Sequence, residues 1–393
     1  MTFRNLSDPS EERASRAMTD IVETRDPRER FGRAGLYPAD LDPTEDSSGG
    51  RLLPGARRGR ERQLSRIVAL GGGSGLPVVL RGLRRHLPPE CRITAVVTAA
   101  DNGGSSGVLR EQYGVLPPGD IRNCLIALAR VAPEVLAALQ YRFDGGSGAA
   151  HPVGNLLLTA LDMVAADEVT AIRLAAGLLG VRDVVLPATT TRVHLVAKLG
   201  DGRQVRGESQ IPRSGAPIAS LRIDPPDARP APGVLEAVRT ADAVILGPGS
   251  LYTSILAALI VPGMVEAVAA APGARILVCN LMTEPGETDG HGVAAHLDAL
   301  AAHGLPRDTF DYVVVNTGPV PMKVRARYSA EGAEPVRVDF APSAGPPLVV
   351  ADDLIDPGPV VRHAADKLGP LLCTLAAGHS PRERGVIVTP VRE

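Results

Sequence analysis

The chain has 393 residues, of which 44% are hydrophobic, so it can bury a large core in one big α/β domain or in two smaller ones. Its formal net charge of -2 excludes a bulk attraction to nucleic acid or to acidic membranes. The N-terminus lacks an apolar signal-peptide core, and no apolar run is long enough to cross a bilayer. These features predict a soluble, unsecreted protein, and four scattered cysteines without a C-x-x-C pair favour free thiols in a reducing cytosol.

Residues 1–63 differ in composition from the rest of the chain. They mix Arg with Asp and Glu in nearly equal numbers and show no sustained apolar periodicity, which is typical of a flexible N-terminal extension. A solvated leader is the simpler interpretation, and a docking tail is the alternative. The sequence leaves open whether Ser and Thr residues of this extension are phosphorylated.

The first regular element ends in a glycine-rich turn. Residues Ile67–Leu70 predict a buried strand, glycines and Ser74 follow it, and Pro77 favours the start of a helix. Bare backbone N–H groups and the positive helix end would point at one place, which suits a phosphate or pyrophosphate. The third glycine of the dinucleotide fingerprint and a P-loop lysine are both missing, so another nucleotide or phosphorylated ligand is expected. A tight turn without a ligand is the alternative.

A polar loop follows the second predicted strand, Ile93–Thr98. Residues Asp101–Gly107 combine an acid, an amide, glycines and serines, which can bind a ribose hydroxyl, Mg²⁺ or a phosphate. An Asx-turn with serines capping the next helix explains the same residues without a ligand. Further on, rigid prolines precede Asp120, which is predicted to be a helix N-cap, and Asn123. Both side chains are candidates for a polar site.

The middle of the chain departs from an α/β pattern. Helices are predicted over residues 133–143, 153–166 and 169–179. Short strands over residues 184–186, 191–199, 204–208 and 218–223 then predict a β-rich insertion at about 184–224, or an antiparallel extension of the main sheet.

Alternating strands and helices return after this insertion. Strands are predicted over residues 243–246, 275–279, 312–315 and 348–350, and helices over 261–270, 292–303, 321–330 and 359–368. The alternation predicts a doubly wound, mostly parallel sheet that binds ligands at the carboxyl ends of its strands. That edge would bring together the loops at Gly71, Asp101, Gly247, Asn280 and Asn316. We expect a single α/β domain over 64–377 and a frayed tail over 378–393.

A second glycine loop, Gly247–Ser250, follows a predicted strand directly and resembles another anion cradle. Two cradles at one sheet edge suit a ligand with two phosphates. The acidic loop Thr283–Gly290 either holds sugar hydroxyls or is solvated. Eight histidines show no spacing typical of a metal site. No catalytic residue is assigned, and Asp101 is the candidate ligand for Mg²⁺.

Six motifs, in order, resemble one family of known proteins. They span about residues 65–375 and are Ala69–Leu76, Thr98–Gly107, Leu116–Asn123, Gly154–Leu158, Gly247–Ser254 and Cys279–Gly290. The family is the YvcK-type gluconeogenesis factor family, a CofD-like family related to phospholactate transferase. The resemblance implies a CofD-like, Rossmann-related α/β fold.

The resemblance also implies a function. Members are cytoplasmic bacterial proteins that bind a UDP-sugar, typically UDP-N-acetylglucosamine, and support cell shape and envelope synthesis during gluconeogenic growth. No firm catalytic activity comes with the family. Partners would be cell-envelope or regulatory proteins, and a homo-oligomer is compatible with the sequence. Two positions depart from the family pattern: Ser74 replaces Thr but keeps a hydroxyl, whereas Asn102 replaces a second Asp and weakens a paired-aspartate metal site.

Residue by residue, the resemblance assigns a nucleotide contact to Ser74 and UDP-sugar contacts to Tyr328 and Arg362. A tyrosine can stack on uracil or bond a sugar, and an arginine can bind a diphosphate bidentately. A half-buried helix position for Tyr328 and a surface position for Arg362 are the alternatives. The candidate ligand-binding set is Gly72, Gly73, Ser74, Gly75, Asp101, Asn102, Gly103, Ser105, Asp120, Asn123, Asn155, Gly247, Gly249, Ser250, Thr253, Asn280, Tyr328 and Arg362.

The leading hypothesis is therefore a UDP-sugar-binding regulatory protein. The alternative is a Mg²⁺-dependent phosphotransferase resembling phospholactate transferase, with Asp101 and Asp120 as metal ligands. A nicotinamide-dependent dehydrogenase fits the fold but lacks the fingerprint glycine.

Overall fold

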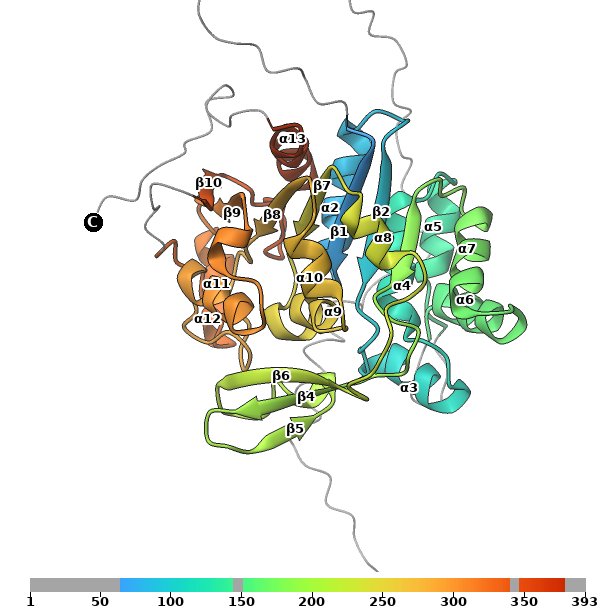
Figure 1. Ribbon diagram of the computed structural model, residues 1–393, viewed down its shortest axis with the longest axis horizontal. Helices are drawn as coiled ribbons and strands as arrows, with labels where there is room; N and C mark the ends of the chain where they lie inside the picture. The colour runs from blue at the N-terminus through green and yellow to red at the C-terminus, as the bar shows by residue number, and fades with distance from the viewer. Residues whose placement is uncertain (1–63, 144–150, 340–345, 379–393) are drawn as a thin grey trace, which may run out of the picture. The chain divides into compact units, whose positions relative to one another are not determined.

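A seven-stranded parallel sheet with the order β10-β9-β8-β7-β1-β2-β3 forms the centre of the fold (Figure 1). The computed structural model describes residues 64–143, 151–339 and 346–378. The strands are β1 (Arg66–Gly71), β2 (Arg92–Val97), β3 (Val184–Pro187), β7 (Ala243–Leu246), β8 (Ala274–Val278), β9 (Tyr312–Asn316) and β10 (Leu348–Asp352). The strand order reverses beside β1, so the adjacent carboxyl ends of β1 and β7 form the switch point of a doubly wound sheet. The predicted fold class is confirmed.

Apolar cores cover both faces of the sheet, which explains why its strands are nearly continuous apolar runs. In β1, Val68 and Leu70 belong to one core, and Ile67 and Ala69 belong to the other. Full burial of each large aliphatic side chain contributes about 1.5–3 kcal/mol.

Helices on the face of Ile67 flank the first glycine loop. On this face α2 (Gly75–His86) packs closely against α13 (Ala365–Ala376). The same core receives side chains from α4 (Pro118–Leu128), α5 (Pro133–Gln140), α6 (Val153–Val164) and α7 (Glu168–Leu178). The short helix α3 (Gly104–Tyr113) lies beyond the carboxyl edge of the sheet (Figure 1).

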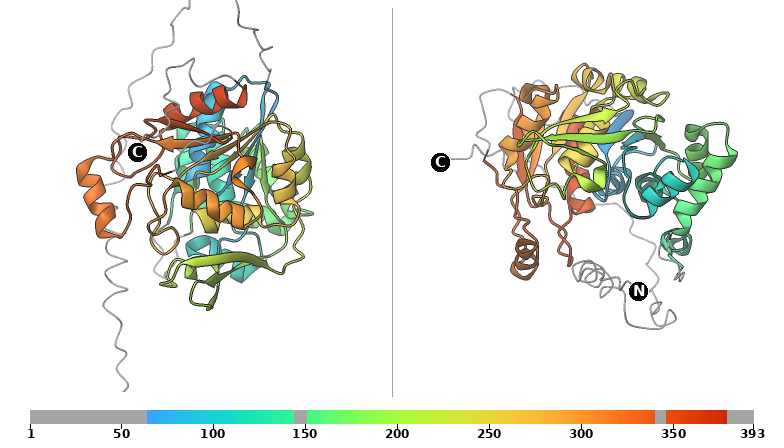
Figure 2. Two further views of the ribbon diagram at one scale, coloured as in Figure 1. Left: turned by 60° about the vertical axis from the view of Figure 1, so that its left-hand side comes forward. Right: turned by 90° about the horizontal axis from the view of Figure 1, so that it is seen from below.

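The opposite face is covered by α8 (Val234–Arg239), α10 (Met264–Ala269) and α11 (Val293–Ala302). A π-helical segment, η2 (Leu251–Leu256), runs into the single turn α9 (Ala257–Leu259). Short 3₁₀ turns are η1 (Glu208–Gln210) and η3 (Arg307–Thr309). Helix α12 (Met322–Ala330) has no buried residue and stands clear of the sheet in both views of Figure 2.

The predicted insertion is a separate three-stranded antiparallel sheet with the order β5-β4-β6. Its strands are β4 (His194–Leu199), β5 (Gln204–Arg206) and β6 (Ile218–Asp224). Residues 184–186, which we had placed in the insertion, instead form β3 and pair in parallel with β2 in the main sheet. An apolar run this short does not show in the sequence which strand it pairs with. Its place in the main sheet is set by its long-range pairing with β2.

Three other expectations need correction. Helix α4 begins at Pro118 with Pro117 as its N-cap, so Asp120 lies inside the first turn and is not the cap. Helix α3 begins at Gly104, within the predicted loop. The last helix begins at Ala365 rather than at residue 359, because the preceding residues fold back through a bridge between Ile355 and His363. Helix α8 and segment η2 were not predicted.

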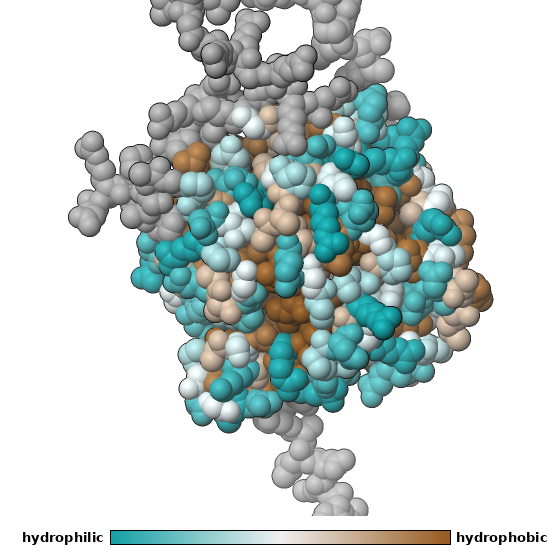
Figure 3. Space-filling view, viewed as in Figure 1, coloured by the Kyte–Doolittle hydropathy of each residue, from teal (hydrophilic) through white to brown (hydrophobic). Residues whose placement is uncertain are grey.

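The predictions for residues 1–63 and 379–393 lie outside the described residues. Among the helices that the structure describes, none is both long enough and apolar enough to span a bilayer. Polar side chains spread over most of the described face in Figure 3, with a small apolar area near its centre, where the helices meet the inserted sheet.

Candidate functional site

The two glycine loops meet at the switch point. Gly71–Ser74 follows β1 and Gly247–Ser250 follows β7. A Cβ atom at Gly75 would lie 2.2 Å from the carbonyl oxygen of Pro248, and one at Gly249 would lie 3.2 Å from that of Gly72. Because the backbones approach so closely, only glycine fits at Gly75. The loops therefore present backbone groups, together with the N-terminus of α2, where Ser74 makes no capping bond with its side chain.

A pocket of about 330 Å³ opens beside these loops. It brings together six predicted residues from five parts of the chain: Ser74, Gly75, Gly249, Asn280, Tyr328 and Arg362. Thr283, Glu284 and Pro285 of the acidic loop also line it. The volume lies within the range of small-molecule sites, roughly 300–1,000 Å³. We call this space the switch-point pocket.

Asn280 contributes an amide at the end of β8. Its Oδ1 accepts a hydrogen bond of 3.1 Å from the Gly249 N–H, which fixes the orientation of the amide. Its Nδ2 is then left buried without a partner. A buried donor without an acceptor is costly, at about 1–3 kcal/mol, so this group is suited to an acceptor supplied by a ligand.

Tyr328 and Arg362 reach the pocket from α12 and from the loop before α13. The Tyr328 hydroxyl accepts a hydrogen bond of 3.2 Å from the Val361 N–H, and this bond joins the two segments. The guanidinium of Arg327 lies 5.5 Å from the centre of the Tyr328 ring. Tyr328 is half-buried and Arg362 is exposed, which agrees with the positions expected for them without a ligand. Both side chains nevertheless line the switch-point pocket.

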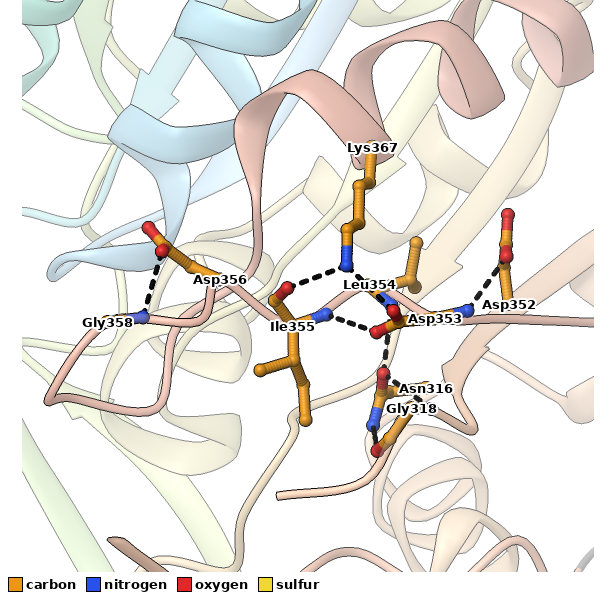
Figure 4. A network of polar contacts seen from close by, with 9 residues as sticks. All are labelled: Asn316, Gly318, Asp352, Asp353, Leu354, Ile355, Asp356, Gly358 and Lys367. Atoms are coloured by element: carbon orange, nitrogen blue, oxygen red, sulfur yellow. Dashed lines mark hydrogen bonds and ion pairs between the residues drawn. The ribbon is translucent and has the colours of Figure 1, made fainter. Parts of the chain in front are cut away.

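A polar network anchors the loop that carries Arg362 (Figure 4). Asn316, at the end of β9, accepts hydrogen bonds through Oδ1 from the N–H groups of Leu354 and Gly318. Lys367 donates to Asp353 Oδ2 at 2.7 Å and to the Ile355 carbonyl at 3.0 Å. The amide of Asn316, which the sequence grouped with the ligand loops, is thus used to position this segment.

His363 is a pocket residue that the sequence analysis missed. It is buried and lines the switch-point pocket beside Arg362. Burial lowers its pKa to about 4, so the imidazole is neutral at pH 7, and its Nε2 has no partner. Its position next to Arg362 could have marked it as a candidate pocket residue, but nothing in the local sequence indicates that its side chain is buried.

Three buried or half-buried carboxylates lie behind the cradle. Asp120 Oδ2 accepts a hydrogen bond of 2.7 Å from the Gly73 N–H, and burial raises its pKa to about 6. Burial, with Asp101 and Glu287 nearby, raises the pKa of Glu208 to about 7. Burial, with Glu284 nearby, raises the pKa of Glu287 to about 7. Glu208 comes from the inserted segment and was not predicted.

Carboxylates of this kind are the oxygen donors that Mg²⁺ prefers. Asp101 raises the pKa of both Asp120 and Glu208 by repulsion, so the three groups lie near one another. In the described ranges, however, no group of three acidic, His or Cys side chains has a geometry that could hold a metal ion. The donors suit the ion chemically, but their arrangement does not form a ready site.

The other predicted residues support the loops around the pocket. Asn155 is buried, accepts a bond of 2.7 Å from Arg122 and donates one of 3.0 Å to Ser105 Oγ. Asn123 accepts a bond from the same arginine. Gly103 is the N-cap of α3, and its N–H donates to Asp101 Oδ1 at 2.8 Å.

Hydrogen bonds also engage three further predicted residues, Asn102, Thr253 and Ser250. Asn102 Oδ1 accepts a bond of 2.9 Å from the Ser209 N–H, which ties the insertion to the Asp101 loop. Thr253 donates to Glu287 Oε1 at 2.8 Å. Ser250 accepts backbone bonds from Ser254 and Ile255, and the wide π-turn begins there.

Comparison with known proteins identifies the family of the chain. The model of the family described as 2-phospho-L-lactate transferase CofD matches residues 67–353, which include both glycine loops and β1 to β10. The chain belongs to the CofD family. The matched residues contain the carboxyl edge of the sheet and end before Arg362.

Similar proteins have been named gluconeogenesis factors, some with the qualifier putative, and one similar protein has a crystal structure. A gluconeogenesis factor of Bacillus subtilis is 42% identical over 316 residues, covering 80% of this chain and 98% of its own. A putative gluconeogenesis factor of Nostoc sp. is 43% identical over 311 residues, covering 78% of this chain and 68% of its own. A crystal structure of a Bacillus halodurans protein of the UPF0052 family has a TM-score of 0.74 and 39% identity, covering 79% of this chain and 99% of that one.

Proposed function

We propose that this chain is a cytoplasmic regulatory protein that binds a UDP-sugar, UDP-N-acetylglucosamine or a close analogue, in the switch-point pocket. The observation that carries the proposal is the pocket itself. Two glycine loops, the unpartnered amide of Asn280 and the guanidinium of Arg362 face one space at the switch point. Their chemistry matches a diphosphate attached to polar rings.

Different walls of the pocket would contact different parts of the ligand. The diphosphate lies at the glycine loops, where Ser74 and the α2 N-terminus offer N–H and hydroxyl donors. The Tyr328 ring and the neutral imidazole of His363 are suited to a base or sugar, because one offers an apolar face and the other a nitrogen acceptor.

A role in gluconeogenic growth and in envelope synthesis is part of the same proposal. It is supported by the name gluconeogenesis factor that the Bacillus subtilis and Halalkalibacterium halodurans relatives carry. Its partners would be envelope-synthesis or regulatory proteins, which would respond to the liganded form.

Isothermal titration of UDP-N-acetylglucosamine into the purified full chain tests the proposal, together with the variants Ser74→Ala and Arg362→Ala. We expect saturable binding to the wild-type chain. Loss of one charge-assisted bond in Arg362→Ala should weaken binding by about 10- to 100-fold. Ser74→Ala removes a neutral hydroxyl and should weaken it less. If the wild-type chain does not bind the nucleotide sugar, the proposal is wrong.

A Mg²⁺-dependent phosphotransferase is the second candidate. The description of the matching family and the carboxylates Asp101, Asp120 and Glu208 behind the cradle favour it. Product analysis of the same mixtures, with and without Mg²⁺, separates the two candidates. Intact nucleotide sugar supports the regulatory protein, and Mg²⁺-dependent conversion that is lost in Asp101→Asn supports the transferase.

A further inference from the structure

Helices α2 and α13 cross with almost no space between them. A Cβ atom at Gly82 would lie 2.7 Å from the Ala365 carbonyl oxygen, and one at Gly369 would lie 2.4 Å from the Gly82 carbonyl oxygen. Beside the crossing, Arg85 forms an ion pair of 2.5 Å with Asp366. The close approach of the backbones at the two glycines fixes the start of α13 against the middle of α2, and the exposed ion pair lies outside this contact.

This crossing brings Arg81 of α2 near Arg362, which lines the switch-point pocket. Arg81 precedes Gly82, and Arg362 precedes Ala365 by three residues. Burial lowers the pKa of Arg81, and the nearby charges of Arg85 and Arg362 lower it further. Within the described ranges, no hydrogen bond or ion pair neutralises the guanidinium groups of Arg81 and Arg362, and Asp366 is bound to Arg85.

Arg81 also lies on the side of α2 that faces the pocket. Ser74, Val78 and Arg81 follow one another at spacings of four and three residues, so they share one face of the helix. Ser74 and Val78 line the pocket. Helical side chains lean toward the N-terminus, so the long Arg81 side chain can extend along this face toward the pocket.

We propose that Arg81 is a second cationic ligand of the pocket, which acts with Arg362 to bind the phosphate groups of the nucleotide sugar. Two like charges that repel each other, one of them half-buried, are unfavourable in the empty protein. A dianionic group between them removes the repulsion and supplies the missing acceptors. This inference rests on the proposed function, because it assigns the phosphate contacts of that site.

The test compares Arg81→Gln with Arg85→Gln, a matched control one turn further along α2 that removes the same charge from an exposed ion pair. We expect Arg81→Gln to bind UDP-N-acetylglucosamine about 10- to 100-fold more weakly than the wild-type chain, and Arg85→Gln to bind it within about 3-fold. Uridine, which lacks phosphates, should bind both variants equally. A structural role for Arg81 would weaken uridine as well and would overturn the inference.

Thermal unfolding gives an independent measurement. Without a ligand, Arg81→Gln should raise the unfolding temperature, because it removes a half-buried charge that has no counterion. Arg85→Gln should leave it unchanged or lower it. A fall in Arg81→Gln would contradict the inference.

Pyrophosphate separates this inference from the proposed function. If the wild-type chain binds pyrophosphate but not the nucleotide sugar, and Arg81→Gln loses that binding, the two-arginine site stands and the UDP-sugar proposal fails. If the nucleotide sugar binds equally to the wild-type chain and to Arg81→Gln, the proposed function stands and the two-arginine site fails. If the wild-type chain binds neither compound, both fail.

Discussion

Asp120 holds a carboxylate against the first glycine loop at a cost in desolvation. Its Oδ2 accepts the Gly73 N–H, and burial raises its pKa from 3.8 to about 6. A raised pKa means that the native state binds a proton more tightly than the unfolded state. The resulting stabilisation is complete below pH 4 and is lost as the pH rises through about 6.

The first prediction follows from the raised pKa of Asp120, which makes its carboxylate destabilising above pH 6. Asp120→Asn keeps an oxygen acceptor for Gly73 but removes the charge, so it should stabilise the protein above pH 6 relative to the wild type, by at most about 3 kcal/mol. The gain should shrink as the pH falls to 4. Urea unfolding at pH 4.5 and pH 7.5 measures both values. Asp201→Asn is the control, because hydrogen bonds from Arg203 lower the pKa of Asp201 and its effect should have the opposite sign. Equal gains at both pH values would contradict this account.

Tyr328 gives a second prediction. Tyr328→Phe keeps the ring but removes the acceptor for the Val361 N–H, so the loop carrying Arg362 loses its bond to α12. We expect binding of UDP-N-acetylglucosamine to weaken by about 2- to 10-fold, which corresponds to one net hydrogen bond. Titration measures the change, and Tyr141→Phe, on an exposed side chain outside the pocket, is the control. An unchanged affinity would mean that this bond does not position Arg362.

At the scale of residues, the sequence can identify pocket residues that follow a predicted strand, because parallel strands place their carboxyl ends at the ligand-binding edge of the sheet. Asn280 directly follows an apolar run, Ser74 follows another after three glycines, and both line the pocket. His363 and Glu208 could not be found in this way, because their shifted pKa values come from burial by distant segments. Asp120 was misread for the same reason. Its carboxylate bonds to Gly73, 47 residues away, rather than to its own helix.

At the scale of elements, the crossing of α2 and α13 holds the loop of Arg362 over the pocket. The two helices touch through glycines, so a methyl group at either position meets backbone atoms that cannot move aside. The N-terminus of α2 lines the switch-point pocket. If the pocket binds the nucleotide sugar as proposed, packing at this crossing and binding are coupled through one contact.

This coupling predicts that Gly82→Ala destabilises the protein by about 1–3 kcal/mol through overpacking and also weakens nucleotide-sugar binding. Gly177→Ala, in the open part of α7, is the matched control and should be stabilising by up to about 1 kcal/mol. Thermal unfolding and titration measure the two effects. Retention of wild-type stability in Gly82→Ala would show that the helices can separate freely.

The elements themselves could be predicted where periodicity is strong. The strands β1, β2, β7, β8 and β9 agree with their apolar runs to within one residue at each end. The last helix was placed six residues too early, because the bridge between Ile355 and His363 overrides the local preference. Residues 184–186 were assigned to the wrong sheet, since a short strand does not encode its partner.

At the scale of the whole molecule, a net charge of -2 provides no general attraction for an anion. Binding must then come from local charges such as Arg81 and Arg362, and it must stabilise the folded chain by mass action. At a ligand concentration of 100 times Kd we expect about 2.7 kcal/mol of added stability, which is a rise of several degrees in the unfolding temperature. The rise should be smaller in Ser74→Ala at the same concentration. A ligand that binds without raising the unfolding temperature would contradict binding to the folded state.

The most direct test of the central claim is a crystal structure of the full chain with UDP-N-acetylglucosamine. The account predicts the diphosphate at the Gly72–Ser74 and Gly247–Ser250 loops, within hydrogen-bond distance of Arg362, and the base and sugar beside Tyr328 and His363. A nucleotide sugar bound anywhere else, with the switch-point pocket empty, would contradict it.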